Sequence, residues 1–141
     1  MATGYWLFLI QKIKMSTLKK TIEEVISVTV ASGSSTVTSV PSFLPGGKIT
    51  HVAAFFRDYA AINTGLVRAS IKDVNGQEVS QMQSIENYRD REAGYLAGKK
   101  PLPINGGNNF TVTITATANF SAAFNVDFVF VYEDENCDPQ Y

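Results

Sequence analysis

The chain has 141 residues, of which 45% are hydrophobic and 18% are charged. This composition is typical of a single globular domain and excludes an intrinsically disordered chain. The formal net charge of −1 disfavours nucleic acid or an anionic membrane as a partner, because no global positive field is present to recruit either. The single cysteine, Cys137, excludes an internal disulfide and a cysteine metal cluster.

The first twenty residues are predicted to form an N-terminal arm ahead of the domain. An unbroken apolar run, YWLFLI, begins at Tyr5. The run is too short to span a membrane, and it lacks the preceding basic residue and the cleavage site of a secretory signal. We therefore predict neither secretion nor membrane insertion, and we expect Tyr5, Trp6 and Phe8 to pack on the domain or on a neighbouring subunit. Translation from Met15 is the alternative, and it would remove the run.

From residue 21 onward the chain is predicted to be almost entirely β-strand, because apolar residues recur at a period of two. TIEEVISVTVASG and STVTSVP flank a Gly-Ser turn and are expected to form a first hairpin, with Ile26, Val28 and Val30 facing the core. KITHVAAFFRD follows the turn PGG and has apolar residues on both faces. This strand is therefore expected to be buried on both sides.

The Asn75–Gly76 pair predicts a second hairpin with a type I′ turn, because both residues tolerate positive φ. Centring the turn on this pair fixes which residues of the two arms face each other. The inward-facing pairs are expected to be Ile71–Ser80, Ala69–Met82 and Val67–Ser84.

Two strands of strong alternation are predicted near the end of the chain. In NFTVTITATANF the core-facing set is expected to be Phe110, Val112, Ile114, Ala116, Ala118 and Phe120, with threonines on the other face. In FNVDFVFVYE the core-facing set is expected to be Phe124, Val126, Phe128, Phe130 and Tyr132. Val129 and Val131 make the second face of this last strand apolar, which is typical of a central strand covered on both sides.

Together these segments predict an all-β fold, a single antiparallel β-sandwich of jelly-roll type with seven to eight strands. The domain is expected to cover residues 21–141 and to end in an acidic tail, and the N-terminal arm could supply the eighth strand. The Cys, Trp, Cys spacing of an immunoglobulin domain is absent, which favours the jelly roll over that fold. A closed barrel is the alternative architecture.

One long irregular stretch, SIENYRDREAGYLAGKKPLPINGGNN, is predicted at residues 84–109. Loops of this length are uncommon in compact domains and are often functional. The stretch combines aromatic and charged side chains, as recognition surfaces do, and we expect Tyr88, Arg89, Arg91 and Tyr95 to contact a partner. The alternative is a short solvated helical turn whose charges merely pair with one another.

The sequence offers little for catalysis, and we expect no catalytic, cofactor-binding or metal-binding residues. His51 is the only histidine and lies in the middle of a predicted strand, where a structural hydrogen-bonded role is the simpler interpretation. The glycines of LPGGKI and INGGNN lack the Lys-Ser/Thr pair and the following helix of a phosphate-binding loop. An enzyme is therefore the least favoured class.

Two other classes stay open, a lectin-like or adhesin module that binds glycans and a protein that acts through assembly. The first twenty residues hold four lysines and no acid, whereas the last nine hold four acids and no base. Segments of opposite charge favour head-to-tail contact between subunits, although two solvated tails would show the same pattern.

Four stretches carry a resemblance to a known family: FLPGGKITHVAAFF, IKDVNGQEVSQ, YRDREAGYLAGKKPLPINGGNNFTVTI and FVFVYE. Over about residues 21–133 the chain resembles the small β-sandwich virion proteins of tailed bacteriophages, namely capsid-auxiliary, decoration or head-fibre proteins like those of crAss-like phages. The resemblance implies a non-enzymatic, oligomeric virion component, assembled in the host cytoplasm, whose partners are itself and other virion proteins. It implies no catalytic residues, and the apolar arm ahead of Met15 departs from it.

Overall fold

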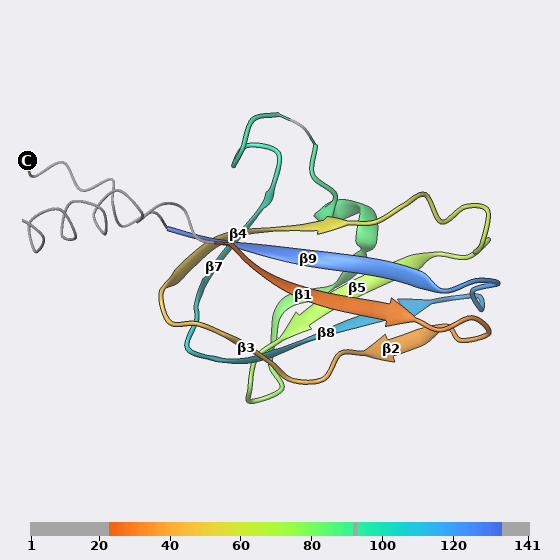
Figure 1. Ribbon diagram of the computed structural model, residues 1–141, viewed down its shortest axis with the longest axis horizontal. Helices are drawn as coiled ribbons and strands as arrows, with labels where there is room; N and C mark the ends of the chain where they lie inside the picture. The colour runs from red at the N-terminus through yellow and green to blue at the C-terminus, as the bar shows by residue number, and fades with distance from the viewer. Residues whose placement is uncertain (1–22, 92, 134–141) are drawn as a thin grey trace, which may run out of the picture.

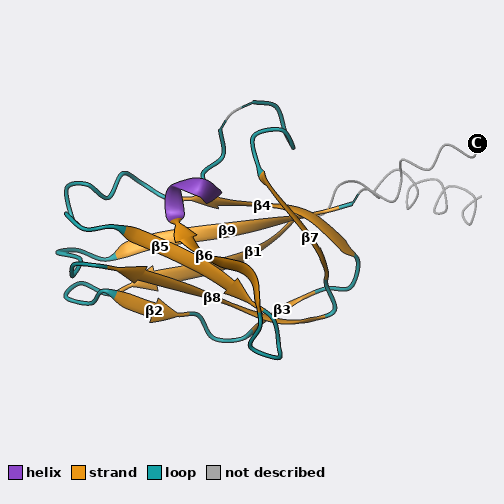
Figure 2. Ribbon diagram, turned by 180° about the vertical axis from the view of Figure 1, so that it is seen from behind, coloured by secondary structure: helices purple, strands orange, loops and turns teal. Residues whose placement is uncertain are grey.

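The computed structural model describes residues 23–91 and 93–133, which form two β-sheets packed face to face (Figure 1). The layers are seen from opposite sides in the two ribbon views, with β1 and β9 in front in Figure 1 and β5 and β6 in front in Figure 2. The elements are β1 Glu23–Val30, β2 Thr36–Thr38, β3 Ser42–Leu44, β4 Lys48–Phe55, β5 Val67–Lys72, β6 Glu78–Ser84, the 3-10 helix η1 Ile85–Tyr88, β7 Lys100–Asn105, β8 Asn108–Ala116 and β9 Phe124–Tyr132. None of the helical turns in the described ranges is long and apolar enough to cross a membrane.

The strand order is that of a jelly roll. One sheet has the order β1-β9-β4-β7 and the other has the order β2-β8-β5-β6, with β3 also pairing with β8. Because β2 and β3 pair with the same strand, they are two parts of one interrupted edge strand, and the described strands then number eight. Pro41 lies in the interruption, where its missing N–H breaks the ladder. The predicted jelly-roll sandwich is therefore confirmed.

The core lies between the two sheets and contains most of the residues that the alternation predicted to face inward. The predictions for Met82, Ser84 and Ala118 are wrong: Met82 and Ser84 are exposed, and Ala118 follows the end of β8 and is half-buried. Ile26, Val28 and Val30 of β1 are buried, and so are the predicted residues of β8 and all five of β9. Strand β9 lies between β1 and β4, as expected for its two apolar faces. Strand β4 is buried on both faces only in part, because its last residue, Phe55, is 45% exposed.

The predicted first hairpin is wrong. Strand β1 pairs with β9, whereas β2 pairs with β8 in the opposite sheet. The connection at residues 31–35 crosses from one sheet to the other, and Gly33 donates its N–H to the carbonyl of Phe120 (2.7 Å). Alternation determines which face of a strand is buried, but it does not determine which strand is its neighbour.

The predicted hairpin between β5 and β6 is present, but its turn differs from the expected type I′. The Gly76 N–H donates to the carbonyl of Asp73 (3.1 Å), so the central residues of the turn are Val74 and Asn75, and Gly76 follows with a φ of 80°. The Asp73 carboxylate causes the change, because its Oδ1 accepts hydrogen bonds from the backbone N–H groups of Asn75 (2.9 Å) and Gln77 (3.0 Å).

The register of this hairpin is correct at one pair only. Ile71 lies opposite Ser80 as predicted. A bulge between Ala69 and Ile71 then shifts the rest, so that Ala69 faces Gln83. The remaining expected pairs, Ala69–Met82 and Val67–Ser84, are not formed, since Ser84 lies opposite Arg68.

The stretch at residues 84–109 is not one irregular loop. It contains η1 and the edge strand β7, which pairs with β4. Two prolines, Pro101 and Pro103, concealed this strand in the sequence, because proline is depleted in strands other than edge strands. The irregular part that remains covers residues 89–91 and 93–99, and it rises above β4 in Figure 1.

Candidate functional site

Tyr88, one of the residues expected to contact a partner, is fully buried, with 0% of its surface exposed. Its hydroxyl is hydrogen-bonded to Ser80 Oγ, and its ring packs edge-to-face on Phe128 with 5.5 Å between centroids. Burial raises the pKa of Tyr88. The expectation for Tyr88 is therefore corrected: it anchors η1 in the core. Strand alternation could not show this, because η1 interrupts the period.

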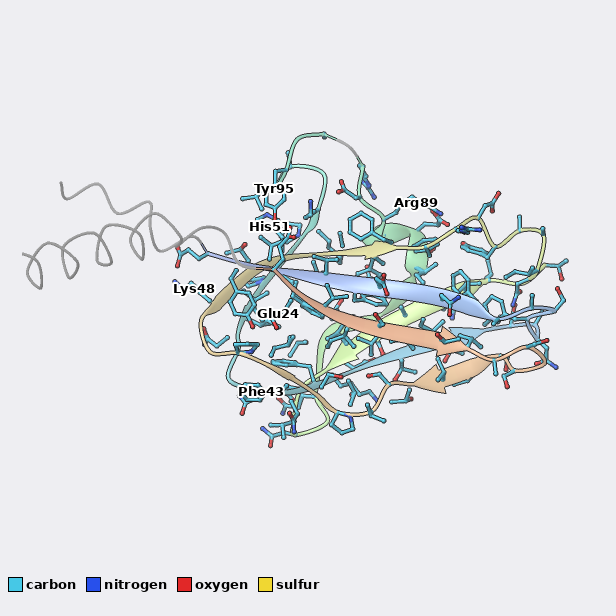
Figure 3. The ribbon with its side chains drawn as sticks, viewed as in Figure 1. Glu24, Phe43, Lys48, His51, Arg89 and Tyr95 are labelled. Atoms are coloured by element: carbon cyan, nitrogen blue, oxygen red, sulfur yellow. The ribbon has the colours of Figure 1, made fainter. Side chains whose placement is uncertain are left out.

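Arg89 is held in place by two neighbours. Its Nε and Nη2 groups donate to the two carboxylate oxygens of Glu86 (2.7 and 3.2 Å), and its guanidinium lies over the ring of Phe56, 4.2 Å from the centroid. The hydrogen bond from Arg89 lowers the pKa of Glu86. This pairing matches the alternative expectation of a helical turn with paired charges. The side chain nevertheless remains 41% exposed, and it lies near the end of β4 in Figure 3.

Tyr95 and Lys99 fasten the loop at residues 89–99 to the sandwich. The Tyr95 hydroxyl donates a hydrogen bond to the Glu23 carboxylate of β1. The buried Lys99 ammonium donates to Asp90 Oδ2 (3.2 Å) and to the Tyr95 carbonyl (2.7 Å), and it lies 4.3 Å from the centroid of the Tyr95 ring. Figure 3 shows Tyr95 above His51, over the sheet of β1, β9, β4 and β7. The loop is thus folded back on the sheet.

Arg91 lines a pocket of about 370 Å³ at the base of this loop. Asn87, Arg89, Lys99 and Lys100 are also part of its lining. Arg89 and Lys99 are paired with acids, whereas Arg91 and Lys100 form no ion pair with any residue in the described ranges. The pocket therefore carries positive charge that is open to an acidic group of a ligand or partner.

A second feature is an apolar area on the outer face of the first sheet, here called the outer-face patch: Val25, Ala53, Val129 and Tyr95. Val129 is paired with Val25 on one side and with Ala53 on the other, so the three form a continuous row across three strands. Glu23 and Val25 are two residues apart on β1, so their side chains point to the same face of the sheet. The Tyr95 hydroxyl is hydrogen-bonded to Glu23, which places Tyr95 at the end of this row. Val25 is 54% exposed and Tyr95 is 50% exposed, whereas Val129 is half-buried and Ala53 is fully buried, so the row is open to solvent at its Val25 end.

Tyr5, Trp6 and Phe8 lie outside the described residues. His51 is half-buried, and its Nδ1 is hydrogen-bonded to Thr50 Oγ1 (2.9 Å), as the structural interpretation expected. Within the part of the chain that the structure describes, no group of three His, Cys, Asp or Glu residues could hold a metal ion. Sequence reasoning missed Val25 and Ala53, because a single apolar residue on an outer face carries no pattern of its own.

Comparison with known proteins gives likenesses in architecture only. No family model matches the chain, and no curated protein matches it. Among solved structures, the capsid asymmetric unit of cyanophage Pam1 is similar at 18% identity and a TM-score of 0.46, over 79% of this chain and 83% of that one. The mitogen of Yersinia pseudotuberculosis is similar at 12% identity and a TM-score of 0.38, over 84% and 92%. A chain of the Bacillus endospore appendages is similar at 13% identity and a TM-score of 0.40, over 81% and 88%.

Proposed function

We propose that this protein is a non-enzymatic structural component of a bacteriophage virion, of the capsid-auxiliary, decoration or head-fibre type, that acts through protein–protein contacts with itself and with other virion proteins. The observation that carries the proposal is the outer-face patch. The outer face of an antiparallel sandwich is normally polar, since water solvates it. An apolar row on that face, next to a cationic pocket, is typical of a surface that another protein covers.

The row and the pocket would act together in such a contact. Val25 and Val129 supply apolar area at the centre, and Arg91 and Lys100 supply charge beside it. Interfaces are commonly built this way, with an apolar centre and a polar rim. Arg89, Arg91 and Tyr95 remain proposed contact residues on this surface. Tyr88 is buried, and it anchors η1 in the core without reaching the surface.

The first experiment measures the native mass of the full chain by light scattering. We expect a mass above the 15.4 kDa of one chain. Val25→Asp should shift it towards the monomer, because a carboxylate in the outer-face patch would be desolvated on contact. Val40→Asp is the matched control, since Val40 is 78% exposed and lies in the gap between β2 and β3. Equal masses for wild type and both variants would contradict a role of the patch.

The second experiment tests the place of the protein in a virion. Particles of the phage that encodes the chain are purified and their proteins identified by mass spectrometry, and recombinant chain is added to particles that lack it. We expect the chain in the particles, and we expect Arg91→Glu to reduce rebinding while the melting temperature stays the same. Absence of the chain from purified particles would refute the proposed function.

A further inference from the structure

A second hollow, of about 490 Å³, lies at the end of the sandwich away from residues 23 and 133. Strand β4 begins beside Glu133, whose N–H donates to the carbonyl of Lys48 (2.7 Å), and it ends at Phe55, opposite Asp127. The hollow is formed where β4 ends and where β9 begins, by residues 55–58 and 122–125 together with Ile62. In Figure 1 this is the right-hand end, where the connections β1–β2, β4–β5 and β8–β9 gather.

Phe56 and Phe124 line the hollow and belong to a packed group of aromatic rings that supports it from behind. The ring of Phe56 meets Tyr59 (5.9 Å between centroids) and Phe124 (5.8 Å), and Tyr59 meets Phe124 edge-to-face (5.5 Å). Phe120 stacks on Phe124 at 4.9 Å. Arg89 holds Phe56 as well, through the cation–π contact. Since these rings fix one another, this support is in place before any ligand arrives, which reduces the entropy lost on binding.

Phe55 differs from the other rings because it is open to solvent. It is 45% exposed and lines the hollow next to Phe56. An exposed ring beside these fixed aromatic rings is a surface on which the apolar face of a flat ligand can stack.

Polar groups with unused hydrogen-bonding capacity surround these rings. Asp58 uses Oδ1 to accept the N–H of Ala60 (3.0 Å), and Asn125 uses Oδ1 to accept the hydroxyl of Thr29 (2.6 Å). Asp58 Oδ2, the Asn125 amide N–H groups and the Arg57 guanidinium have no hydrogen bond or ion pair among the residues that the structure describes, although the Asp58 charge acts on Arg89 from a distance. The hollow therefore presents acceptors and donors side by side, with one charge of each sign.

We propose that this hollow binds a neutral hexopyranose residue of a glycan. A pyranose ring has an apolar C–H face that fits Phe55, and its hydroxyl groups both donate and accept, as Asp58, Arg57 and Asn125 require. A charged sugar is disfavoured, because Arg57 and Asp58 balance each other. A purely apolar partner would leave three polar side chains without hydrogen bonds. The site goes beyond the proposed structural role, and its residues lie outside the outer-face patch.

The test begins with a glycan array probed with the full chain, followed by calorimetry with the free sugars that bind. We expect neutral hexoses to bind, and we expect Phe55→Ala and Arg57→Ala each to weaken the binding by about tenfold or more, as truncation of central contacts does. Phe43→Ala and Arg68→Ala are the matched controls, since both residues are exposed on the opposite sheet, and both variants should bind like the wild type.

Three outcomes would overturn the proposal: no binding of any neutral hexose at millimolar concentration, binding of acidic sugars alone, or binding that Phe55→Ala and Arg57→Ala leave unchanged. Native mass is measured on the same samples. Arg57→Ala should keep the native mass of the wild type, so that loss of sugar binding and loss of assembly are read separately.

Discussion

The guanidinium of Arg89 lies over the ring of Phe56 and is held there by Glu86, so that this partly exposed arginine joins η1 to the aromatic residues at the end of β4. An exposed cation–π contact contributes about 0.5–1 kcal/mol, and a pair of surface charges contributes about 0.2–1 kcal/mol. We therefore expect Arg89→Glu to lower the free energy of unfolding by about 1–2 kcal/mol, measured by urea denaturation. Arg91→Glu removes no such contact and should stay within about 0.5 kcal/mol of the wild type. Equal stability of the two variants would show that the Arg89 contacts contribute little.

Tyr59 provides a pH-dependent signal. Burial and the hydrogen bond to Glu86 raise the pKa of Tyr59 from 10.0 to about 12. Between these two values the unfolded chain loses the phenol proton while the folded chain keeps it, so the stabilisation is complete below pH 10 and is lost as the pH rises through 12. Tyr59→Phe should therefore show a smaller loss of stability between pH 10 and pH 12. Ultraviolet absorbance of phenolate, compared between wild type and variant, should reveal one tyrosine that titrates near 12.

Two glycines on facing turns should respond differently to alanine. A Cβ on Gly106 would lie 1.9 Å from the carbonyl oxygen of Pro45, whereas a Cβ on Gly46 would meet nothing within 4 Å. Gly106→Ala must shift the backbone of the facing turn, and we expect a loss of about 1–3 kcal/mol, as for other overpacked sites. Gly46→Ala should be close to neutral. Thermal melting of both variants is the measurement, and a Gly106→Ala protein as stable as the wild type would contradict the close approach of the two turns.

Two buried serines, Ser70 and Ser80, differ in their hydrogen bonding and should therefore respond differently to alanine. Ser70 Oγ is buried and has no hydrogen-bond partner among the described residues, whereas Ser80 Oγ is bonded to the buried hydroxyl of Tyr88. Ser70→Ala removes an unsatisfied group and should leave the stability unchanged or raise it. Ser80→Ala removes the hydroxyl that is hydrogen-bonded to Tyr88 and should cost about 1–3 kcal/mol. The measurement is the denaturant concentration at the midpoint of unfolding for both variants. A large loss of stability in Ser70→Ala would mean that the Ser70 hydroxyl is hydrogen-bonded in the folded protein.

The turn between β5 and β6 places Gly76 in a backbone conformation that favours glycine. Gly76 has a φ of 80°, in the region that β-branched residues avoid. Gly76→Val should destabilise the fold by about 1 kcal/mol or more, while Asn75→Gly should cost little because the backbone it requires remains allowed. A Gly76→Val protein that melts at the temperature of the wild type would refute the turn geometry.

Period-two alternation was sufficient to predict most of the core and the two-layer fold, because alternate residues of a strand point to opposite faces and the apolar face is the one that is buried. Ile26, Val28 and Val30 are the clearest case. The partner of β1 was not predictable, since either sheet would bury the same three residues. The turn after Asp73 was predicted with the wrong type. The Asn-Gly pair favours a type I′ turn, but the Asp73 carboxylate binds the backbone N–H groups of Asn75 and Gln77 and stabilises a different turn.

The candidate site was less predictable than the fold. Arg89, Arg91 and Tyr95 lie on the surface where the sequence suggested recognition, but Tyr88 is in the core. The bond from Tyr95 to Glu23 joins residues 72 positions apart, and nothing local in the sequence indicates it. The aromatic hollow likewise arises from two connections that only the jelly-roll topology brings together.

Prolines lie at one edge of each sheet. Pro101 and Pro103 occupy β7, the last strand of one sheet, and Pro41 interrupts the edge strand of the other. A proline cannot donate to a neighbouring chain, so an incoming strand would find gaps in the ladder at these two edges, whereas the other edge strands, β1 and β6, carry no proline. Strand addition along these edges, which would generate fibres of unlimited length, is therefore obstructed.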